Sequence, residues 1–566
     1  MVPAYALALS LVVTAPLLAP GYLLLRDAVS TPRAYLTDAA LGLTETAPRA
    51  LPQDFAVALG SYVVDGGILV KFLLIAGLWL AGWGGARLAG LVVPAAGVGG
   101  QFVAVTVAVW NPYVAERLLQ GHWSLLVGYG CLPWIAAAVL RLRTAASDGG
   151  GSPWPVLFWI TLAGLTPTGL LLAATVALVS CAAPGSGRSR PRCAALSLAA
   201  AVLGALPWLV APMLAGSLSL TQAAGVPQFA ARAEPGLGTL GSLAGLGGIW
   251  NGQAVPDSRT TVFAALATVV LLVVVAVGVP TVVRRPAAVP LLVLAAAAVL
   301  SPALMATGPG LAAVEAIARA VPGLGVLRDG QKWVALAMPG YAVAGAGAVA
   351  TLASVTATVR RRLPPGVTAA VCCLALLAVL PDLAWGVAGK VTSVRYPAGW
   401  TAAAALINSD PRPVAVLPPD SMRHYPWAGD APVLDPLPRW VSADVLSTGD
   451  LVIGGQTVPG EGERAREVQR LVLSGAGADQ LAGAGVGWVV VEGGGAATAR
   501  LALPVAFADD DIVVYRVGGD RPAASGRSIM IAVHVVWLAA LCAGAVGTLV
   551  TRRGTGRRAR SQPTAG

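Results

Sequence analysis

Asp27 is the residue of this sequence best suited to acid–base chemistry. It follows the long apolar stretch 4–25 in the string LLLRDAVSTP, so we expect it just beyond the end of a membrane span. A carboxylate at a membrane surface can take a proton from a hydroxyl group while a phosphate group leaves. The alternative is that Asp27 caps the interface and pairs with Arg26 or Arg33. We assign Asp27 as the candidate catalytic residue.

A second group of candidates lies in the string WNPYVAERLLQGHW, residues 110–123. The pattern predicts a short amphipathic helix at the membrane interface, starting at Asn111-Pro112. In such a helix Arg117 or His122 could contact the phosphate of a lipid. The alternative is that the aromatic side chains of the segment form an interfacial belt. The substrate-binding candidates here are Asn111, Glu116, Arg117 and His122.

The string LRDGQKW, residues 327–333, places two cations where the topology described below predicts the outer membrane boundary. Lys and Arg usually collect on the cytoplasmic side, so cations at the outer side suit an anionic partner such as the phosphate or pyrophosphate of a lipid carrier. The alternative is that they form salt bridges with Asp329 or with acids of the first outer loop. The substrate-binding candidates here are Arg328, Asp329 and Lys332.

The first outer loop, expected at residues 26–66, adds Asp38 and Asp54 to the substrate-binding candidates. Carboxylate oxygens are ligands that Mg²⁺ or Mn²⁺ prefers, but the acids of this loop form no Asp-x-Asp pair. The six cysteines show no Cys-x-x-Cys spacing and predict no zinc site. We assign no cofactor, and Mg²⁺ or Mn²⁺ is the candidate divalent cation.

The elements that must position these residues are those of a membrane protein. Hydrophobic residues make up 56% of the chain and charged residues 11%, whereas soluble domains carry about 25% charged residues. The net charge of +11 follows from arginine clusters such as Arg284-Arg285 and Arg360-Arg361-Arg362, which fall in every second connection. This alternation predicts a multi-pass plasma-membrane protein with cytoplasmic N- and C-termini, and no nucleic-acid partner.

Ten apolar stretches are long enough to cross a bilayer, which needs about 20 residues per helix. A further stretch, residues 154–183, is interrupted at Thr166-Pro167-Thr168-Gly169. Pro removes a backbone donor and Gly loosens a helix, so this stretch predicts a broken re-entrant hairpin, or alternatively one long kinked helix. The expected fold is therefore a polytopic α-helical membrane protein of about ten full spans plus this hairpin.

Residues 395–522 are expected to form a small extracytoplasmic α/β or α+β domain before the last span. The strings PVAVLP, GWVVVE and DIVVYRV predict buried strands, while residues 398–407 and 463–474 show helical spacing. The expected division is a multi-span domain at 1–394 with outer loops 26–66, 111–122, 215–259 and 306–332, the soluble domain at 395–522, a final span at 523–551 and a basic cytoplasmic tail at 552–566.

The strings PGYLLLRD, NPYVAERLLQGHW and LRDGQKW, together with this architecture, resemble the GT-C superfamily of glycosyltransferases that use polyprenyl-phosphate sugars. In that family an Asp of the first outer loop acts as the base or positions the acceptor, and Asp27 is the matching position. Many members carry a DD, DE or ED pair in that loop, which this sequence lacks. The Ala-, Gly- and Arg-rich composition resembles high-GC actinobacteria, whose donors include decaprenyl-phospho-arabinose and polyprenyl-phospho-mannose.

The first hypothesis is therefore a membrane glycosyltransferase that moves a sugar from a polyprenyl-phosphate donor to an envelope glycan or lipid on the outer face of the plasma membrane. The alternative is a non-catalytic membrane scaffold or lipid- or glycan-binding protein of envelope assembly. Transport is disfavoured because the apolar stretches contain almost no charged residues. The first two hypotheses differ in whether Asp27 and the cations of 327–333 meet at one cavity.

Overall fold

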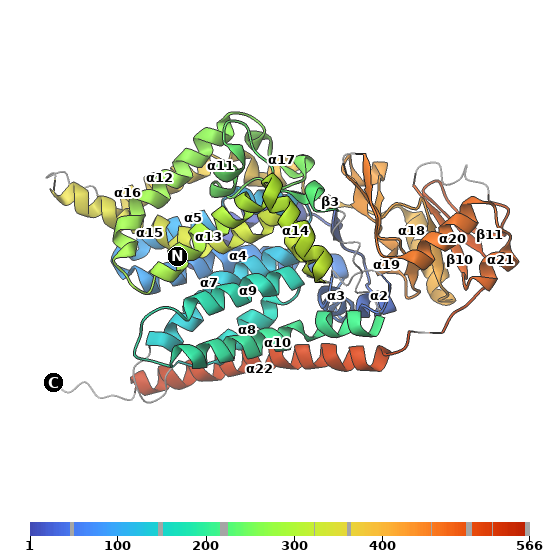
Figure 1. The fold of residues 1–566 in the computed structure, drawn as a ribbon, viewed down its shortest axis with the longest axis horizontal. Helices are drawn as coiled ribbons and strands as arrows, with labels where there is room; N and C mark the ends of the chain where they lie inside the picture. The colour runs from blue at the N-terminus through green and yellow to red at the C-terminus, as the bar shows by residue number, and fades with distance from the viewer. Residues whose placement is uncertain are drawn as a thin grey trace.

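The structure is a computed structural model that describes the chain except for residues 46–49, 145–150, 216–224, 322, 359–363, 454, 494–500, 523 and 561–566. The predicted cytoplasmic cluster Arg360-Arg361-Arg362 and the end of the basic tail lie outside the described residues. The chain forms a helical bundle with an α/β domain at one end (Figure 1). The last helix runs along one edge of the bundle.

The helices of the bundle and its connections are α1 (Val2–Thr14), α2 (Asp38–Leu41), α3 (Gln53–Gly60), α4 (Gly66–Val92), α5 (Gly97–Val109), α6 (Pro112–Leu119), α7 (Trp123–Thr144), α8 (Trp154–Ala163), α9 (Pro167–Ser180), α10 (Arg190–Ala215), α11 (Gly238–Ala244), α12 (Phe263–Val283), α13 (Val289–Met305), α14 (Gly308–Ala320), α15 (Met338–Thr358), α16 (Pro365–Ala378), α17 (Ala384–Gly389) and α22 (Arg527–Arg560). Two 3-10 helices, η7 (Leu324–Arg328) and η8 (Gly330–Ala337), precede α15.

The ten full spans predicted are not confirmed. Within the described residues, six helices are long and apolar enough to cross a membrane, or eight if two bent helix pairs each count as one span. The long six are α4, α7, α10, α12, η8 with α15, and α22. Helix α5 has 13 residues and rises only about 20 Å, because each helical residue adds about 1.5 Å.

The prediction that the first apolar stretch is one long helix was wrong, because the stretch consists of an α-helix, a 3-10 turn and a strand. Helix α1 ends at Thr14, a 3-10 turn extends to Leu18, and strand β1 (Tyr22–Leu25) follows. Pro16 and Pro20 lie in this part of the sequence, and Pro interrupts the hydrogen bonding of a helix. Asp27 therefore lies in the turn of a β-hairpin and not at the end of a transmembrane helix.

The break predicted in residues 154–183 is confirmed. Helix α8 ends at Ala163 and helix α9 begins at Pro167. The hydroxyl of Thr166 caps α9 by accepting a hydrogen bond of 3.0 Å from the Gly169 amide. The two helices pack on each other and on α7 and α10. That they re-enter the membrane from one side stays a prediction.

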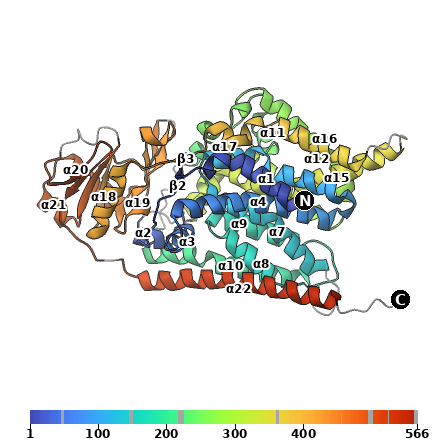
Figure 2. The ribbon, with the colours of Figure 1, turned by 180° about the vertical axis from the view of Figure 1, so that it is seen from behind.

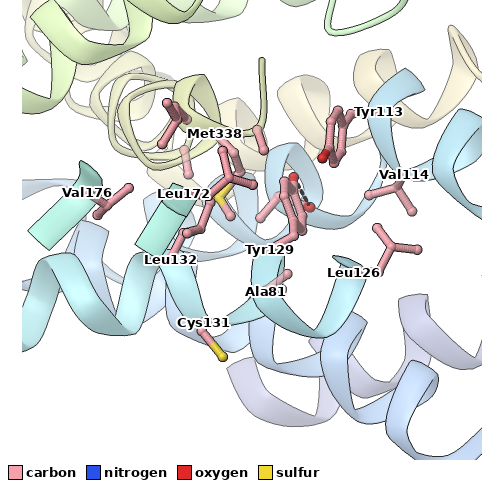
Figure 3. Close-up of a cluster of buried hydrophobic side chains, with 14 of the residues drawn as sticks. Ala81, Tyr113, Val114, Leu126, Tyr129, Cys131, Leu132, Leu172, Val176 and Met338 are labelled. Carbon is pink, nitrogen blue, oxygen red and sulfur yellow. Dashed lines mark hydrogen bonds between the residues drawn. The ribbon is translucent and has the colours of Figure 1, made fainter. Parts of the chain in front are cut away.

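The core of the bundle is built around α7. In its most apolar stretch of 18 residues, 94% of the residues are buried. A Cβ atom on Gly130 of α7 would lie 2.2 Å from the Gly77 carbonyl oxygen of α4, so glycine permits the two helices to pack closely. Tyr113 of α6 stacks on Tyr129 of α7 with ring centroids 5.2 Å apart. Figure 3 shows these two rings beside Val114 and Leu126. This packing fixes the position of α6, which carries several candidate residues.

The α/β domain contains a five-stranded sheet of order β11-β12-β10-β4-β7. Strands β10, β4 and β7 are parallel, while β12 and β11 join in antiparallel register. The strands are β4 (Val414–Leu417), β5 (Met422–Arg423), β6 (Val433–Leu434), β7 (Val445–Leu446), β8 (Leu451–Ile453), β9 (Gln456–Val458), β10 (Trp488–Glu492), β11 (Val505–Ala508) and β12 (Ile512–Arg516), and the helices are α18 (Ala398–Ser409), α19 (Leu437–Trp440), α20 (Glu463–Leu473) and α21 (Ala478–Gly483). The predicted strands and helical stretches of this domain are confirmed.

The residues of the first loop connect the two parts. Strand β1 pairs with β2 (Ala28–Val29) on one side and with β3 (Ser393–Val394) on the other. Figure 2 shows β2, β3, α2 and α3 between the bundle and the α/β domain. The main chain of Arg26 also forms a parallel bridge with Val433 of β6. Asp27 therefore lies where the bundle and the α/β domain meet.

Candidate functional site

A cavity of about 1840 Å³ lies between the bundle and the α/β domain. Its walls come from the first loop, the α6–α7 connection, the start of α9, the end of α10, η7 and the α/β domain. Seven of the ten predicted site residues line it: Asp27, Asp38, Asp54, His122, Arg328, Asp329 and Lys332. The acids of the first loop and the cations before α15 therefore meet at one cavity.

The turn that carries Asp27 is tight and conformationally strained. Arg26 has a φ of 49°, a left-handed conformation that non-glycine residues rarely adopt. Its main chain bonds to Pro432 O and Leu434 N at 2.9 and 2.8 Å, and its guanidinium donates to the carbonyls of Leu119 and Gln253. Hydrogen bonds to both the α/β domain and the bundle therefore hold this turn, and Asp27 within it, in place.

Asp27 is held by two side-chain donors from the α6–α7 connection. His122 Nε2 lies 2.9 Å from Asp27 Oδ2, and Gln120 Nε2 donates to the same oxygen at 3.1 Å. Partial burial alone would raise the pKa of Asp27, but these hydrogen bonds and the charge of Lys332 lower it below its usual value. The side chain remains 41% exposed. Asp27 is therefore an ionised carboxylate that faces the cavity.

His122 is held in one tautomer. Arg117 Nη1 lies 3.1 Å from His122 Nδ1, and because an arginine only donates, Nδ1 must accept. The ring proton is then on Nε2, where it is donated to Asp27. Burial lowers the pKa of His122, and the charge of Arg117 lowers it further against the opposing effect of Asp27. His122 is thus a neutral donor that orients the Asp27 carboxylate.

Arg117 is completely buried and forms a two-point ion pair with Asp329. Its Nη1 and Nη2 atoms donate to the two Asp329 oxygens at 2.8 and 3.1 Å, and Nη2 also donates to Gln331. Burial opposes ionisation of Asp329, but the charges of Arg117 and Lys332 lower its pKa far below the usual range. Arg117 therefore supports His122 from behind and does not line the cavity.

The remaining candidates of α6 are also internal, so this helix packs inside the protein, and its place at the membrane interface stays a prediction. Every residue of Pro112–Leu119 is buried. Glu116 accepts hydrogen bonds from the Gly248 and Ile249 amides, both at 3.1 Å, and from Gln331. Asn111 caps α6 through the Val114 amide. Asn111 and Glu116 do not line the cavity and act as packing partners of the site.

Two cations line the same cavity as Asp27. Lys332 Nζ lies 3.7 Å from Asp329 Oδ2, which is the salt bridge named above as the alternative to an anionic partner. Arg328 stacks over the Phe229 ring at 4.2 Å, and Phe229 packs edge-on against Trp250 at 4.6 Å. All of these side chains line the cavity. The cavity thus presents positive charge and aromatic surface beside a carboxylate.

Asp38 and Asp54 line the cavity but also join its walls. Asp38 accepts from Arg527 of α22 at 2.5 Å and from the Ala524 amide at 2.7 Å. Asp54 lies 3.3 Å from Arg439 of the α/β domain. These pairs hold the first loop to the last helix and to the α/β domain, so both acids have structural partners in addition to their exposure to the cavity.

Sequence reasoning missed the residues that the α/β domain contributes to the cavity. They include Ser421, Arg423, Asp435 and Asp444. Strand β6 bonds to the main chain of Arg26, so these residues come close to Asp27 although they lie about 400 positions later in the chain. The short strings around them carry no motif. Gln120, beside the predicted His122, could have been found from its place in the same segment.

Within the part of the chain that the structure describes, no group of three or more His, Cys, Asp and Glu residues is arranged to hold a metal ion. A cation bound here would have to share its ligands with a substrate, because the acids around Asp27 are spread over separate walls of the cavity. Asp27 already accepts two hydrogen bonds.

Among solved structures, the chain is similar to a single-particle cryo-EM structure of a mutant of arabinofuranosyltransferase AftD from Mycobacteria, with a TM-score of 0.54 and 18% sequence identity. The match covers 92% of this chain and 41% of that chain, so this chain spans less than half of the length of that protein. No protein-family model matches the sequence. No curated protein matches it either. At this identity, the match shows that nearly all of this chain shares the fold of part of that glycosyltransferase.

Proposed function

We propose that this protein is a membrane glycosyltransferase of the GT-C type that transfers a sugar from a polyprenyl-phosphate donor to an envelope glycan or lipid. The observation that carries the proposal is the cavity in which an exposed, ionised Asp27 faces the cations Arg328 and Lys332. The fold shared with the arabinofuranosyltransferase supports the same class. The proposed site lies at the outer face of the plasma membrane, with both termini in the cytoplasm.

The proposed reaction is a single displacement with inversion. The acceptor hydroxyl gives its proton to Asp27 as its oxygen bonds to the anomeric carbon of the donor sugar. The bond between that carbon and the phosphate oxygen breaks, and polyprenyl phosphate leaves with the electron pair. Arg328 and Lys332 stabilise the charge that develops on the phosphate. Asp27 then releases its proton to water, which restores the carboxylate.

His122 and Gln120 serve this reaction by orientation. Both donate to Oδ2 of Asp27, which leaves Oδ1 for the acceptor hydroxyl. Since Arg117 fixes the tautomer of His122 and Asp329 fixes Arg117, the carboxylate is held by a connected set of hydrogen bonds. Such support limits the rotation of the base and keeps it near the attacking oxygen.

A divalent cation enters the proposal only as a partner of the donor phosphate. Mg²⁺ or Mn²⁺ prefers oxygen ligands, which the donor phosphate could supply. Transfer measured with and without EDTA, followed by readdition of each metal, tests this part separately. Loss with EDTA and recovery with one metal would support it, whereas unchanged transfer would leave Arg328 and Lys332 as the charge-stabilising groups.

The test of the proposal is transfer by the purified full-length protein in detergent or nanodiscs. Decaprenyl-phospho-arabinose and polyprenyl-phospho-mannose would be supplied as radiolabelled donors with an envelope glycan extract as acceptor. We expect transfer from one donor by the wild type and a loss of about 10²–10⁴-fold in Asp27→Asn, the range for removal of a general base. Asp420→Asn, an exposed acid on the same cavity, is the matched control.

The same pair of variants in cells separates catalysis from a scaffold function. If Asp27→Asn at wild-type protein level reproduces the glycan loss of a deletion strain, the catalytic proposal holds and the missing sugar identifies the donor. If only the deletion changes the envelope, the protein acts as a scaffold or lipid- or glycan-binding protein and the proposed reaction is wrong.

A further inference from the structure

The β5–β6 strand pair of the α/β domain forms one wall of the cavity, and this wall contains polar atoms that have no hydrogen-bond partner among the described residues. Ser421, beside β5, and Arg423 of β5 both line the cavity. Ser421 Oγ and Arg423 Nη1 are buried and have no hydrogen-bond partner among the residues that the structure describes. Buried polar side-chain atoms nearly always have a partner, so two unpartnered ones on residues that line the same cavity indicate a bound group.

Arg423 is held rigidly on its other side. Its Nε atom donates to Glu492 Oε2 at 3.1 Å, and its Nη2 atom lies 3.6 Å from Asp435 Oδ2. Tyr425 donates to the same Glu492 oxygen at 2.8 Å. The Arg423 side chain is only 5% exposed. Its position is therefore fixed before any ligand binds, and Nη1 is the atom left for recognition.

The wall lies a short, defined distance from Asp27. Arg26 bridges to Val433 of β6, and Val433 pairs with Arg423 of β5. Neighbouring strands lie about 4.8 Å apart, so two strand spacings separate the Arg26 main chain from that of Arg423 by about 10 Å. A saccharide whose terminal hydroxyl reached Asp27 would bring a following sugar unit to Ser421 and Arg423.

The charge of this wall favours an uncharged ligand. Asp435 and Glu492 flank Arg423, and Arg439, whose charge also acts on Asp435, is paired with Asp54. Burial raises the pKa of Asp435, and burial together with the charge of Asp435 raises that of Glu492. The acid pair already balances the charge of Arg423, so a phosphate would gain little. Hydroxyl groups can accept from Arg423 and donate to Asp435 and Ser421.

We propose that Ser421 and Arg423 form an acceptor subsite for a neutral saccharide, one sugar unit or more away from the bond that Asp27 helps to form. The inference rests on the proposed function, because it treats the occupant as the acceptor. It assigns acceptor recognition to the α/β domain and donor phosphate recognition to Arg328 and Lys332. The two recognition tasks then fall on the α/β domain and on the bundle.

The test measures saccharide binding and transfer separately, with the full-length protein in detergent. The probes are a neutral arabinofuranose tetrasaccharide, a neutral mannose trisaccharide and the anionic mannose 6-phosphate, titrated by saturation-transfer NMR. We expect the wild type to bind a neutral probe and to bind mannose 6-phosphate at least tenfold more weakly. Ser421→Gln, which fills the subsite and leaves the ion pairs intact, and Arg423→Gln should each weaken binding at least tenfold.

Two controls keep the outcomes distinguishable. Arg516→Gln changes an arginine that is 62% exposed and lies outside the cavity, and it should bind like the wild type. Asp27→Asn should bind the neutral probe normally while losing transfer. If Arg423→Gln fails to fold, Ser421→Gln alone decides. The subsite proposal is wrong if both subsite variants bind like the wild type, if mannose 6-phosphate binds as tightly as the neutral probes, or if neither neutral probe binds. If binding is intact and depends on Arg423 but the wild type shows no transfer, the proposed reaction is wrong instead.

Discussion

The Nε2 atom of His122 lies 2.9 Å from the Oδ2 atom of Asp27, and the opposite nitrogen of the same ring lies 3.1 Å from Arg117. This relationship joins a cavity-facing carboxylate to a buried guanidinium through one neutral imidazole. Only 17% of the His122 side chain is exposed. The buried Arg117 therefore holds the His122 ring in place, and the ring in turn holds the Asp27 carboxylate that we propose as the base.

Replacement of His122 by alanine should shift the pH dependence of transfer. The His122 hydrogen bond lowers the pKa of Asp27, so its loss raises that pKa and moves the acid limb of the rate profile to higher pH. We also expect a fall in kcat of about 10- to 100-fold, because a hydrogen bond to a charged group is worth about 1.5–3 kcal/mol. His424→Ala, an exposed histidine on the same cavity, should leave the limb in place. An unmoved limb in His122→Ala would contradict the orienting role.

Removal of the buried Arg117 charge should destabilise the protein strongly. Asp329 would be left as an unpaired buried carboxylate, and breaking one side of a buried ion pair costs about 3–5 kcal/mol. We expect Arg117→Met to lower the temperature of thermal unfolding in detergent well below that of the wild type. Arg319→Met removes an arginine that is 64% exposed and paired with Glu315, and such surface pairs contribute at most about 1 kcal/mol. Equal shifts in the two variants would argue against a buried ion pair.

The sequence singled out Asp27 as the candidate base, a role that stays a prediction, but assigned it the wrong local structure. The run Tyr22–Leu25 is apolar and continues the preceding stretch, so periodicity could not separate a buried strand from the end of a helix. The prolines at positions 16 and 20 were the available signal. Residues of 327–333 and of the first loop line one cavity, the arrangement expected for transfer, although about 300 positions separate Asp27 from Arg328 in the chain.

The sequence could not assign Arg117 to the interior, since its partner Asp329 lies 212 positions away. A local pattern with charged residues at 116 and 117 resembles an exposed helical face whether or not distant partners cover it. The same limit applies to Ser421 and Arg423, which reach the site only because β6 bonds to Arg26. The strands of the α/β domain were predictable because runs such as GWVVVE are short, β-branched and bounded by glycine.

Replacement of Asp444 by asparagine should reduce the pH dependence of stability. Burial and the nearby Asp38 raise the pKa of Asp444 to about 6, above its value of about 3.9 in an unfolded chain. A raised folded-state pKa stabilises the protein at low pH, and this contribution is lost as the pH rises through about 6. We therefore expect the wild type to unfold at a lower temperature at neutral pH than in mild acid.

In Asp444→Asn this difference should shrink, and the variant should be more stable than the wild type at neutral pH. The asparagine oxygen can still accept from the Asp38 amide, which donates to Asp444 at 3.0 Å. Asp420→Asn serves as the control on the same wall. A pH dependence in Asp444→Asn identical to that of the wild type would show that Asp444 does not titrate in this range.

Replacement of Gly121 by alanine should impair transfer more than it impairs folding of the bundle. Gly121 has a φ of +83°, and a Cβ atom there would lie 2.3 Å from the Ala28 nitrogen and 2.4 Å from the Leu25 oxygen. Relief of that clash must move the Asp27 hairpin away from the connection that holds Gln120 and His122.

Gly97→Ala is the matched control, because Gly97 also has a positive φ, of +58°, but nothing lies within 4 Å of its added Cβ. Both variants carry a backbone strain of about 1–3 kcal/mol, because both glycines have a positive φ, and the conformation of Gly97 (φ 58°, ψ −158°) is nearly confined to glycine. We expect a transfer rate at least tenfold lower in Gly121→Ala than in Gly97→Ala, measured at equal amounts of folded protein, since only Gly121 contacts the turn that carries Asp27. Equal rates would mean that the position of this hairpin does not control the reaction.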